Sequence, residues 1–526
     1  MASSTTRIVI VGGGIAGVPL AYAIKARLHG RAEVTLVSDS ADFYFVPANP
    51  WIALGLREEA DVTFALEPLL NGRKIALRVD ALQGVDLEND RLQLADGAEL
   101  EYDYLALATG ICPNWSRVPG TEGNPSVHSV IRPRDASAAH TAYAAFLSRP
   151  GPVIIAAAPR VPTIGPMYEY AFLLDADLRR RALRARVPIT LITPEPYPGH
   201  VGLDKPVARE ELRRALATQN IEWIGNAELR RCEGRRLHFA VYDGREEHHR
   251  SGGHGDTSGH EPEQRSLEFE YATIWPPFRG VEALARNPSL CDEEGLVIVD
   301  EYQRALGRTN VFAIGACTAK PILTHTNVPV GSPDAVYVIQ QQVAIVADNI
   351  THSLRSEPLV RASIEREQWI ADMGKRGAAY LAAPQMPLRN VQWLYQGHWV
   401  YEAKREFEEY FINQILFGAG PHGQIPALVL RLRSQPRRDD MKCRRGALGP
   451  HLPLSTDTRR SLEALARQLE VDAVALSHQL LEQAIAEALS CLDPPMREQV
   501  RADMHARLVD ELRTQRERVR FEGGAP

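Results

Sequence analysis

A glycine-rich turn near the N-terminus constrains the fold of this chain more than any other feature. The segment RIVIV at residues 7–11 has the pattern of a buried strand, and the spacing GxGxxG begins directly after it at Gly12. An Ala-rich stretch to about Arg27 then predicts a helix, and EVTLVSD at residues 33–39 predicts a second strand. Glycine permits a tight turn and a close approach of phosphate to the backbone. The segment therefore predicts a βαβ unit that binds a dinucleotide at Gly12, Gly13, Gly14, Ile15, Ala16 and Gly17.

Further strand ends point to the same ligand. The acid that binds ribose in such units is expected about twenty residues after the glycines, where Ser38 and Asp39 stand. The segment ATG at residues 108–110 and the segment FAIGAC at residues 312–317 each end a predicted strand. Strand ends of a doubly wound sheet converge on one ligand, and this arrangement favours FAD over NAD in the first domain.

The hydrophobic pattern predicts an α/β fold with two dinucleotide-binding (Rossmann-like) domains, a C-terminal amphipathic region and a helical extension. After Gly151 the alternation of strand, helix and strand repeats as PVIIAAA, YEYAFLLDADLRRR and PITLITPE. The predicted parts are an FAD-binding domain at residues 1–150 and 290–350, a second dinucleotide-binding-like domain at 151–289, a C-terminal membrane or quinone-side region at 351–435, and the extension at 436–526.

Composition excludes several other classes of protein. A net charge of -6, with 60 basic and 66 acidic residues, gives no footprint for nucleic acid. The sequence has no run of 18 apolar residues and no signal peptide, so we expect a cytoplasmic protein; peripheral membrane attachment and oligomerisation stay open. The six cysteines are too scattered for a disulfide framework or a zinc site. No metal site is predicted, because nothing fixes the geometry of the loop histidines His248, His249, His254 and His260.

Two C-terminal segments allow more than one interpretation. Aromatic side chains crowd residues 393–417 around Lys404 and Arg405. They suit a helix at a membrane interface, or a helix that covers the flavin domain. Leucines with helical spacing at residues 462–489 predict the extension. It would serve packing or self-association, or a regulatory or DNA-contacting role.

Five specific stretches match one known family: FVPANPWIALG (45–55), GPMYEYAFLLDADLRRR (165–181), TPEPYPGHVG (193–202), ADMGKRGAAYLAAPQ (371–385) and GHWVYEAKREFEEYF (397–411). On these stretches the sequence resembles the sulfide:quinone oxidoreductases and the flavocytochrome c sulfide dehydrogenase flavoproteins from Ile8 to about Gly418. The resemblance implies two dinucleotide-binding-type domains, bound FAD, electron transfer from sulfide to a membrane quinone, and an amphipathic segment that docks on lipid.

The resemblance also implies which residues contact FAD. Beyond the glycine turn they are Ser38, Asp39, Val79, Thr109, Gly110, Gly315, Gly331 and Lys404. Gly331 stands just before a predicted helix, whose dipole would favour the negative charge that reduction brings to the flavin. The family often has a basic residue a few positions later, but this chain has Asp334. An acid there is expected to oppose that charge and to lower the flavin potential.

The catalytic residues implied by the resemblance are Cys317, as the thiol that forms a flavin adduct, and His200, which would shuttle protons. Sulfide oxidation in these enzymes uses a relay of thiols. The other two thiol positions hold Thr163 and Ile131 in this chain, and Cys112 is an open candidate for a replacement. We therefore expect slow sulfide-dependent quinone reduction that an added small thiol accelerates.

Two alternatives remain. The turn after PVIIAAA reads APRVPTIGP, with Arg160 and Val161 where a nicotinamide site needs glycine. NADH is therefore a poor donor candidate, which leaves a small reductant such as sulfide or a thiol. An NADH:quinone oxidoreductase is disfavoured. The missing thiols also allow a flavin-binding scaffold or sensor that acts through its C-terminal helices.

Overall fold

The computed structural model describes residues 5–28, 30–162, 164–200, 206–242, 261–320, 327–332, 334–362, 367–374, 376–383 and 391–417. Contacts divide the chain into one compact unit of residues 1–424 and another of residues 425–526, and every described residue belongs to the first. The predicted helical extension, the loop histidines and Thr163 lie outside the described residues.

The first parallel sheet has the order β20-β9-β1-β2-β5. Its strands are β1 (Thr6–Val11), β2 (Ala32–Ser38), β5 (Ala76–Val79), β9 (Tyr104–Leu107) and β20 (Val311–Ala313). The chain leaves β1 toward β2 on one side and returns to β9 on the other, so the order reverses beside β1, where doubly wound sheets bind ligands. The glycine turn follows β1 at this point.

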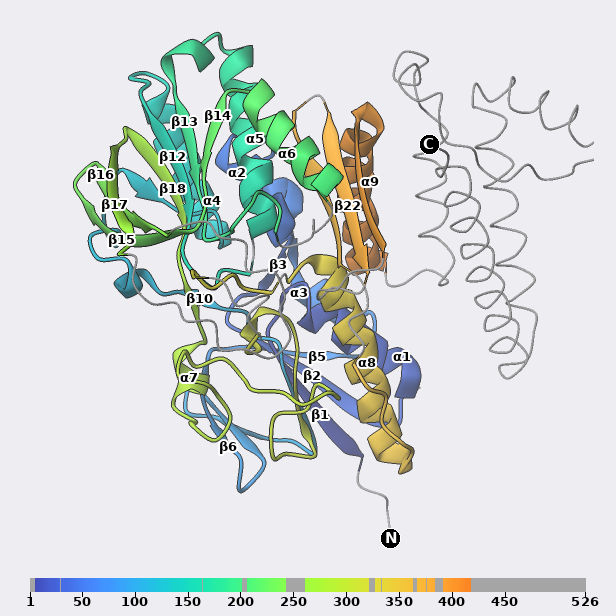
Figure 1. The fold of residues 1–526 in the computed structure, drawn as a ribbon. Coiled ribbons are helices and arrows are strands. Elements are labelled where there is room, and N and C mark those ends of the chain that lie inside the picture. Colours follow the sequence, from blue (N-terminus) through green and yellow to red (C-terminus); the bar gives the residue numbers. More distant parts are fainter. Residues whose placement is uncertain are drawn as a thin grey trace, which may run out of the picture. The chain divides into compact units, whose positions relative to one another are not determined.

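Two layers cover this sheet. The helices α1 (Gly17–Leu28) and α8 (Val336–Arg355) lie side by side on one face (Figure 1), above the buried Ile8 and Ile10 of β1. The other face buries Val9 and Val11 beneath the antiparallel strands β6 (Leu82–Asp86), β7 (Arg91–Leu94) and β8 (Glu99–Glu101). Successive side chains of β1 thus point to opposite faces of the sheet, and both faces are buried.

The second parallel sheet repeats this plan with the order β11-β18-β12-β13-β14. Its strands are β11 (Val127–His128), β12 (Val153–Ala157), β13 (Ile189–Ile192), β14 (Ile221–Ile224) and β18 (Tyr271–Trp275). The helices α4 (Pro133–Phe146), α5 (Ile164–Arg180) and α6 (Pro206–Thr218) pack around it, and β15 (Ala227–Glu233), β16 (Arg236–Val241) and β17 (Glu263–Glu268) form its antiparallel layer. The predicted residue ranges of the domains stay a prediction, although β11 joins the second sheet from within the range 1–150.

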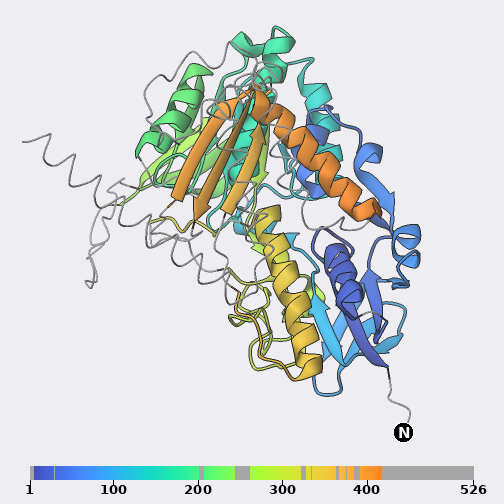
Figure 2. The ribbon, with the colours of Figure 1, turned by 90° about the vertical axis from the view of Figure 1, so that its right-hand side faces the viewer.

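A third sheet follows α8. The antiparallel strands β21 (Glu367–Asp372), β22 (Gly377–Ala383) and β23 (Val391–Gly397) pack against α9 (His398–Phe417), as Figure 2 shows. Phe411 and Ile415 of α9 are buried, and the Phe411 ring lies 5.2 Å from that of Phe45. This face of α9 therefore covers the predicted FAD-binding domain, as one of the two interpretations of the aromatic segment has it.

Short elements complete the described fold. The helices are α2 (Asn49–Ala53), α3 (Leu66–Asn71) and α7 (Glu282–Ala285), and the strand pairs are β3 (Asp42–Tyr44) with β4 (Thr63–Ala65) and β10 (Cys112–Pro113) with β19 (Phe278–Arg279). Single 3₁₀ turns lie at Val46–Ala48, Glu59–Val62, Trp115–Arg117, Arg184–Arg186 and Gly315–Cys317. The predicted α/β fold with two Rossmann-like domains is confirmed.

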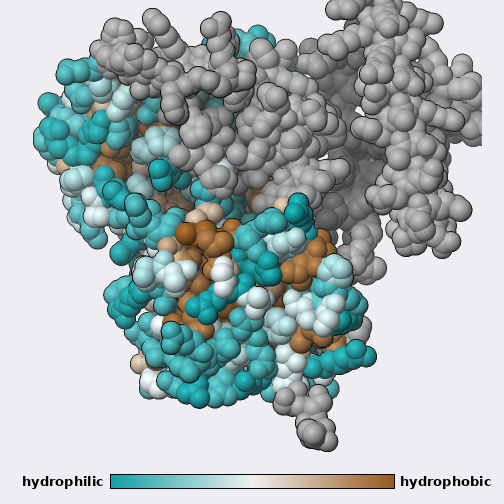
Figure 3. All heavy atoms as spheres, turned by 60° about the horizontal axis from the view of Figure 1, so that its bottom comes forward, coloured by the Kyte–Doolittle hydropathy of each residue, from teal (hydrophilic) through white to brown (hydrophobic). Residues whose placement is uncertain are grey.

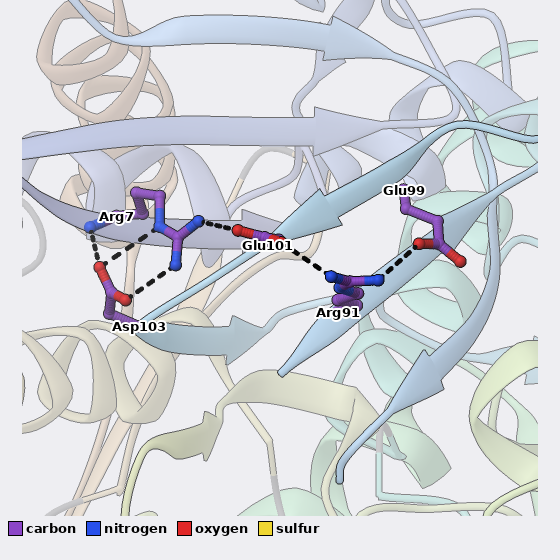
Figure 4. Close-up of polar contacts among 5 residues, drawn as sticks. All are labelled: Arg7, Arg91, Glu99, Glu101 and Asp103. Carbon is purple, nitrogen blue, oxygen red and sulfur yellow. Dashed lines mark hydrogen bonds and ion pairs between the residues drawn. The ribbon is translucent and has the colours of Figure 1, made fainter. Parts of the chain in front are cut away.

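A ladder of charges fastens the start of β1 to the antiparallel layer (Figure 4). The backbone N–H of Arg7 donates to Asp103 at 2.6 Å, and its guanidinium pairs with both Asp103 and Glu101. Arg91 continues the ladder to Glu101 at 3.0 Å and to Glu99 at 3.3 Å. These side chains are exposed, so each ion pair contributes at most about 1 kcal/mol, and the ladder mainly fixes where β1 begins.

One face of the molecule is mostly hydrophilic. In Figure 3 hydrophobic residues form separate small groups within a mostly hydrophilic face. Among the described residues no helix is long and apolar enough to cross a membrane, and no cluster of His, Cys, Asp or Glu could hold a metal ion. In the part of the chain that the structure describes, the exposed large hydrophobic side chains are Val46, Val79, Ile298, Leu306 and Val360.

Candidate functional site

The glycine turn is built by three strand ends that leave no room for side chains. The N–H of Gly12 donates to Val37 at 2.8 Å, and a Cβ at Gly12 would lie 2.1 Å from the carbonyl oxygen of Ala108. A Cβ at Gly17 would lie 1.9 Å from the oxygen of Gly12, whereas a Cβ at Gly14 would meet no atom within 4 Å. Gly12 and Gly17 thus let the chain pack closely, whereas Gly14 borders open space at the start of α1. A pyrophosphate fits this arrangement, because the helix start offers free amides and positive dipole charge.

The predicted ribose contacts lie at the end of β2. The Ser38 side chain is buried against Gly13, whose Cβ would lie 2.6 Å from the Ser38 hydroxyl oxygen. The next residue, Asp39, is exposed, as is half of Val79 at the end of the neighbouring β5. Asp39 is therefore the residue of the predicted pair whose carboxylate is accessible to a ribose.

The remaining glycines lie at the ends of β9 and β20. Gly110 has a φ of +69°, and a Cβ there would meet no atom within 4 Å. Gly315 has a φ of +74°, donates its N–H to Gln342 Oε1 at 2.9 Å, and would place a Cβ 3.5 Å from Ala16 of the glycine turn. The predicted contacts from β1, β9 and β20 thus converge at one sheet edge, and their shape fits FAD. Their assignment to FAD stays a prediction.

Gly331 is required by packing between the two domains. A Cβ at Gly331 would lie 2.4 Å from the carbonyl oxygen of Arg160, and the N–H of Arg160 donates to Pro329 at 2.8 Å. Arg160 adopts a φ of +64°, a conformation that favours glycine. The turn that would hold nicotinamide phosphates is therefore occupied by the segment before α8.

A second feature of this domain also disfavours a nicotinamide. Glu195 follows β13, where such domains carry a ribose-binding acid, but it is fully buried. The Tyr168 hydroxyl donates to Glu195 Oε2 at 2.6 Å and accepts from Trp223 Nε1 and from the N–H of Gly199, each at 3.2 Å. The acid is thus held by side chains of its own domain.

The same network positions His200. Its ring is buried, stands edge-on to Tyr197 at 4.8 Å, and follows Gly199, which Tyr168 holds. The structure therefore anchors the loop that carries the predicted proton shuttle, although nothing in it tests that role.

Cys317 lies inside the core. Its side chain has no exposed surface, and its sulfur contacts the carbonyl oxygens of Leu107 at 3.4 Å and Ile314 at 3.2 Å. Burial raises the pKa of the thiol, and the nearby Lys320 and Thr109 offset this in part. Sulfide can reach this sulfur only if the segment around Cys317 moves. This condition could not be predicted from the sequence.

The other thiol positions differ in their surroundings. Asn49 donates to the carbonyl oxygens of Val130 at 2.8 Å and Ile131 at 3.0 Å, which fixes the loop where the family would have a cysteine. The indole of Trp369 covers Gly165, two residues after position 163. Cys112 is only half-buried, on β10.

Lys404 lies in a buried polar cluster made by α2, α5, β21 and α9, which we call the α5–α9 cluster: Trp51, Glu169, Asp372 and Lys404. Lys404 Nζ pairs with Glu169 at 3.2 Å and lies 5.4 Å from the centre of the Trp51 ring. The N–H of Asp372 donates to Glu169 at 2.9 Å, and Trp51 Nε1 donates to Asp372 at 3.0 Å. If Lys404 contacts FAD, its ammonium group would therefore bind FAD and the carboxylate of Glu169 at the same time.

Two acids share this one cation. Burial raises the pKa of Glu169, and Lys404 offsets it in part. Burial, with the nearby Glu169, raises the pKa of Asp372 to about 6, against the Trp51 hydrogen bond. Neither acid was predicted as a site residue, although both lie in stretches that carry the family resemblance, and Trp51 does as well. The spacing of the sequence gives no signal that these stretches meet.

Comparison with known proteins decides the family. Residues 6–143 match the family model described as pyridine nucleotide-disulphide oxidoreductase. The chain is 31% identical to the sulfide-quinone reductase of Aquifex aeolicus (strain VF5), over 82% of this chain and 96% of that protein. The chain belongs to the sulfide:quinone oxidoreductase family.

The solved structures agree with this assignment. The crystal structure of the sulfide:quinone oxidoreductase from Aquifex aeolicus matches with a TM-score of 0.73 and 28% identity, over 81% of this chain and 95% of that one. The structure of NDH2 from Plasmodium falciparum in complex with NADH matches with a TM-score of 0.55 at 14% identity, over 79% of this chain and 99% of that one, which shows the fold alone. As a member of the sulfide:quinone oxidoreductase family, this chain is an FAD-dependent oxidoreductase.

Proposed function

We propose that this chain oxidises sulfide or a small thiol and passes the electrons through FAD to a quinone. The relationship to the Aquifex aeolicus sulfide-quinone reductase, which spans nearly the whole of that protein, carries the proposal. The occupied turn at Arg160 and the buried Glu195 support it, because both disfavour a nicotinamide site in the second domain.

The first domain would hold the cofactor. The amides from Gly12 to Gly17 would bind the pyrophosphate at the start of α1, and Asp39 would bind ribose hydroxyls. The strand ends at Thr109, Gly110 and Gly315 would line the remainder, with Ser38, Val79, Gly331 and Lys404 as further proposed contacts. Bound FAD supplies a two-electron carrier between donor and acceptor.

The overall reaction balances with an external sulfur acceptor. One sulfide and one thiol lose two electrons and two protons to form a hydropersulfide, and the quinone takes up both to become a quinol. Cys317 is the proposed attachment point for sulfur, provided that its segment opens, and His200 would move the protons. Ile131 supplies no second thiol that could take the sulfur from Cys317, so an added small thiol should accelerate slow turnover.

The test is anaerobic mixing of the purified yellow protein with sulfide, with a dithiol and with NADH in turn, followed at the flavin absorbance band. We expect sulfide or the dithiol to bleach the flavin, NADH to leave it unchanged, and a quinone to restore the colour. Bleaching by NADH alone would overturn the proposed donor, and purification without flavin would overturn the whole proposal.

We further propose peripheral contact of α9 with a membrane, so that a lipid-soluble quinone can reach the flavin domain. The interspersed charges and aromatic residues of α9 support this. Co-sedimentation with lipid vesicles tests it, and a protein that stays in the supernatant at low salt would contradict it.

If FAD is bound but no donor reduces it, the replaced thiols favour the alternative of a flavin-binding sensor.

A further inference from the structure

One largely buried ion pair joins two segments beside the proposed flavin site. Lys320 Nζ lies 3.3 Å from Asp334 Oδ1, and the side chains are 17% and 1% exposed. Apart from this pair, neither carboxylate oxygen of Asp334 has a hydrogen-bond partner among the described residues. Asp334 therefore depends on Lys320 for its charge to remain buried.

The pair joins two segments that carry predicted flavin contacts. Lys320 follows the 3₁₀ turn that contains Gly315, and Asp334 follows Gly331 and precedes the first residue of α8, Val336. Lys320 and Asp334 act with opposite signs on the Cys317 thiol, which Thr109 contacts at the end of β9. The two charges are thus close to the sheet edge where the predicted contacts converge.

This arrangement adds a cation to the expectation drawn from Asp334 alone, which stays a prediction. As an unpaired acid, Asp334 would oppose negative charge at the flavin. The structure gives it a lysine partner from a different segment, so a cation is present although the expected position holds an acid. A buried pair of this kind adds little net stability, because desolvation of both ions opposes their attraction.

We propose that Lys320 is the cation that stabilises the reduced flavin in this chain, and that Asp334 holds Lys320 in place and limits how much of its charge the flavin experiences. The inference rests on the proposed FAD site and deepens it. Two-electron reduction with uptake of one proton leaves the flavin ring with one negative charge, which a nearby fixed cation stabilises. In this proposal Lys320 acts on the charge of the reduced cofactor, and Asp334 is a positioning residue that acts through Lys320.

The midpoint potential of the bound flavin, measured by spectroelectrochemistry, tests the inference. Lys320→Met should lower the potential, because it leaves the carboxylate of Asp334 unpaired. Asp334→Asn should raise it, because the full charge of Lys320 then acts on the flavin. Each shift should correspond to at least about a tenfold change in the equilibrium constant for reduction, which is about 30 mV for a two-electron couple. Lys320→Arg should stay close to wild type.

A second readout does not depend on turnover. Sulfite adds to the oxidised flavin and leaves negative charge on the ring, so its affinity should fall in Lys320→Met and rise in Asp334→Asn. Arg286→Met, which breaks the exposed pair with Glu282, is the matched control and should change neither quantity. Stoichiometric flavin and unchanged circular dichroism show that each variant is folded, and the double variant Lys320→Met with Asp334→Asn removes both charges should Lys320→Met unfold.

The outcomes separate the two proposals. Shifts of opposite sign in the single variants, with the double variant between them, support the inference. Shifts of the same sign, or none, in proteins that retain FAD overturn it and leave the proposed function untouched. Loss of FAD from the folded single variants also overturns it, because the pair would then serve cofactor binding. A wild-type protein without FAD overturns the proposed function instead.

Discussion

At the scale of single residues, two cysteines that follow predicted flavin contacts in the sequence, Cys317 and Cys112, have different environments. Cys317 is fully buried with a raised pKa, whereas Cys112 is half-buried on a two-residue strand. The thiolate is the form that attacks a thiol reagent, so burial and the raised pKa should both slow the reaction of Cys317. The residue with the better match to the family is therefore expected to react more slowly in this conformation.

We predict that iodoacetamide modifies Cys112 at least about tenfold faster than Cys317 in the folded protein. Mass spectrometry of each cysteine-containing peptide over time measures both rates, and denaturant should make them equal. If sulfide accelerates modification at Cys317, the segment opens during the reaction and its proposed role gains support. Equal rates without sulfide would show that the core around Cys317 is open.

The pKa of Asp372 leads to a prediction about stability and pH. Because burial raises this pKa from 3.8 to about 6, the folded protein favours the protonated acid. The stability from this group is fully present below about pH 4 and is lost as pH rises to about 6. Relative to Asp372→Asn, the wild type should lose at most about 3 kcal/mol of unfolding free energy across this window.

Denaturant unfolding of both proteins at several pH values measures the Asp372 effect. The exposed Asp42→Asn is the control, and its difference from wild type should stay flat. A difference between wild type and Asp372→Asn that is also flat from pH 4 to pH 7 would show that Asp372 is ionised throughout.

At the scale of elements, the glycine turn offers a substitution that separates folding from cofactor binding. A Cβ at Gly14 meets no protein atom within 4 Å, so Gly14→Ala should leave the fold intact. The added methyl would occupy the space proposed for the pyrophosphate. We expect FAD affinity to fall at least about tenfold, or about 1.4 kcal/mol.

Fluorescence titration of the deflavinated protein with FAD measures the effect of Gly14→Ala. Gly72→Ala at the end of α3 is the matched control, because its Cβ would meet its nearest atom at 3.7 Å, an ordinary contact. Unchanged affinity in Gly14→Ala would place the pyrophosphate elsewhere.

Elements that are local in sequence could be predicted, and contacts between distant elements could not. The turn from Gly12 to Gly17 and the buried strands on either side of it have a pattern that physical chemistry explains residue by residue. The hydrogen bond from Trp51 to Asp372 joins residues 321 positions apart, and no periodic pattern in the sequence predicts it. The direction of Cys317 was also hidden, because one 3₁₀ turn after β20 decides which face of the sheet receives the sulfur.

At the scale of the whole molecule, the proposed flavin chemistry belongs to the compact unit of residues 1–424. We predict that a protein without residues 440–526 retains stoichiometric FAD and its rate of flavin reduction by sulfide. Rapid mixing of this variant and the full chain under the same conditions measures both rates. Loss of flavin reduction in the shortened protein would show that the extension takes part in the chemistry.

The strand order of the two sheets also sets a sequence of events during synthesis. The second sheet draws on a continuous stretch, from β11 at residue 127 to β18 at residue 275, so it can assemble as soon as that stretch leaves the ribosome. The first sheet begins with β1 but needs β20 at residues 311–313, and its covering helix α8 comes later still. The first sheet can therefore be completed only after about 300 further residues are translated, and the face that α8 covers stays incomplete until then. Chaperone demand during expression should fall on the flavin half of the protein, although that half is made first.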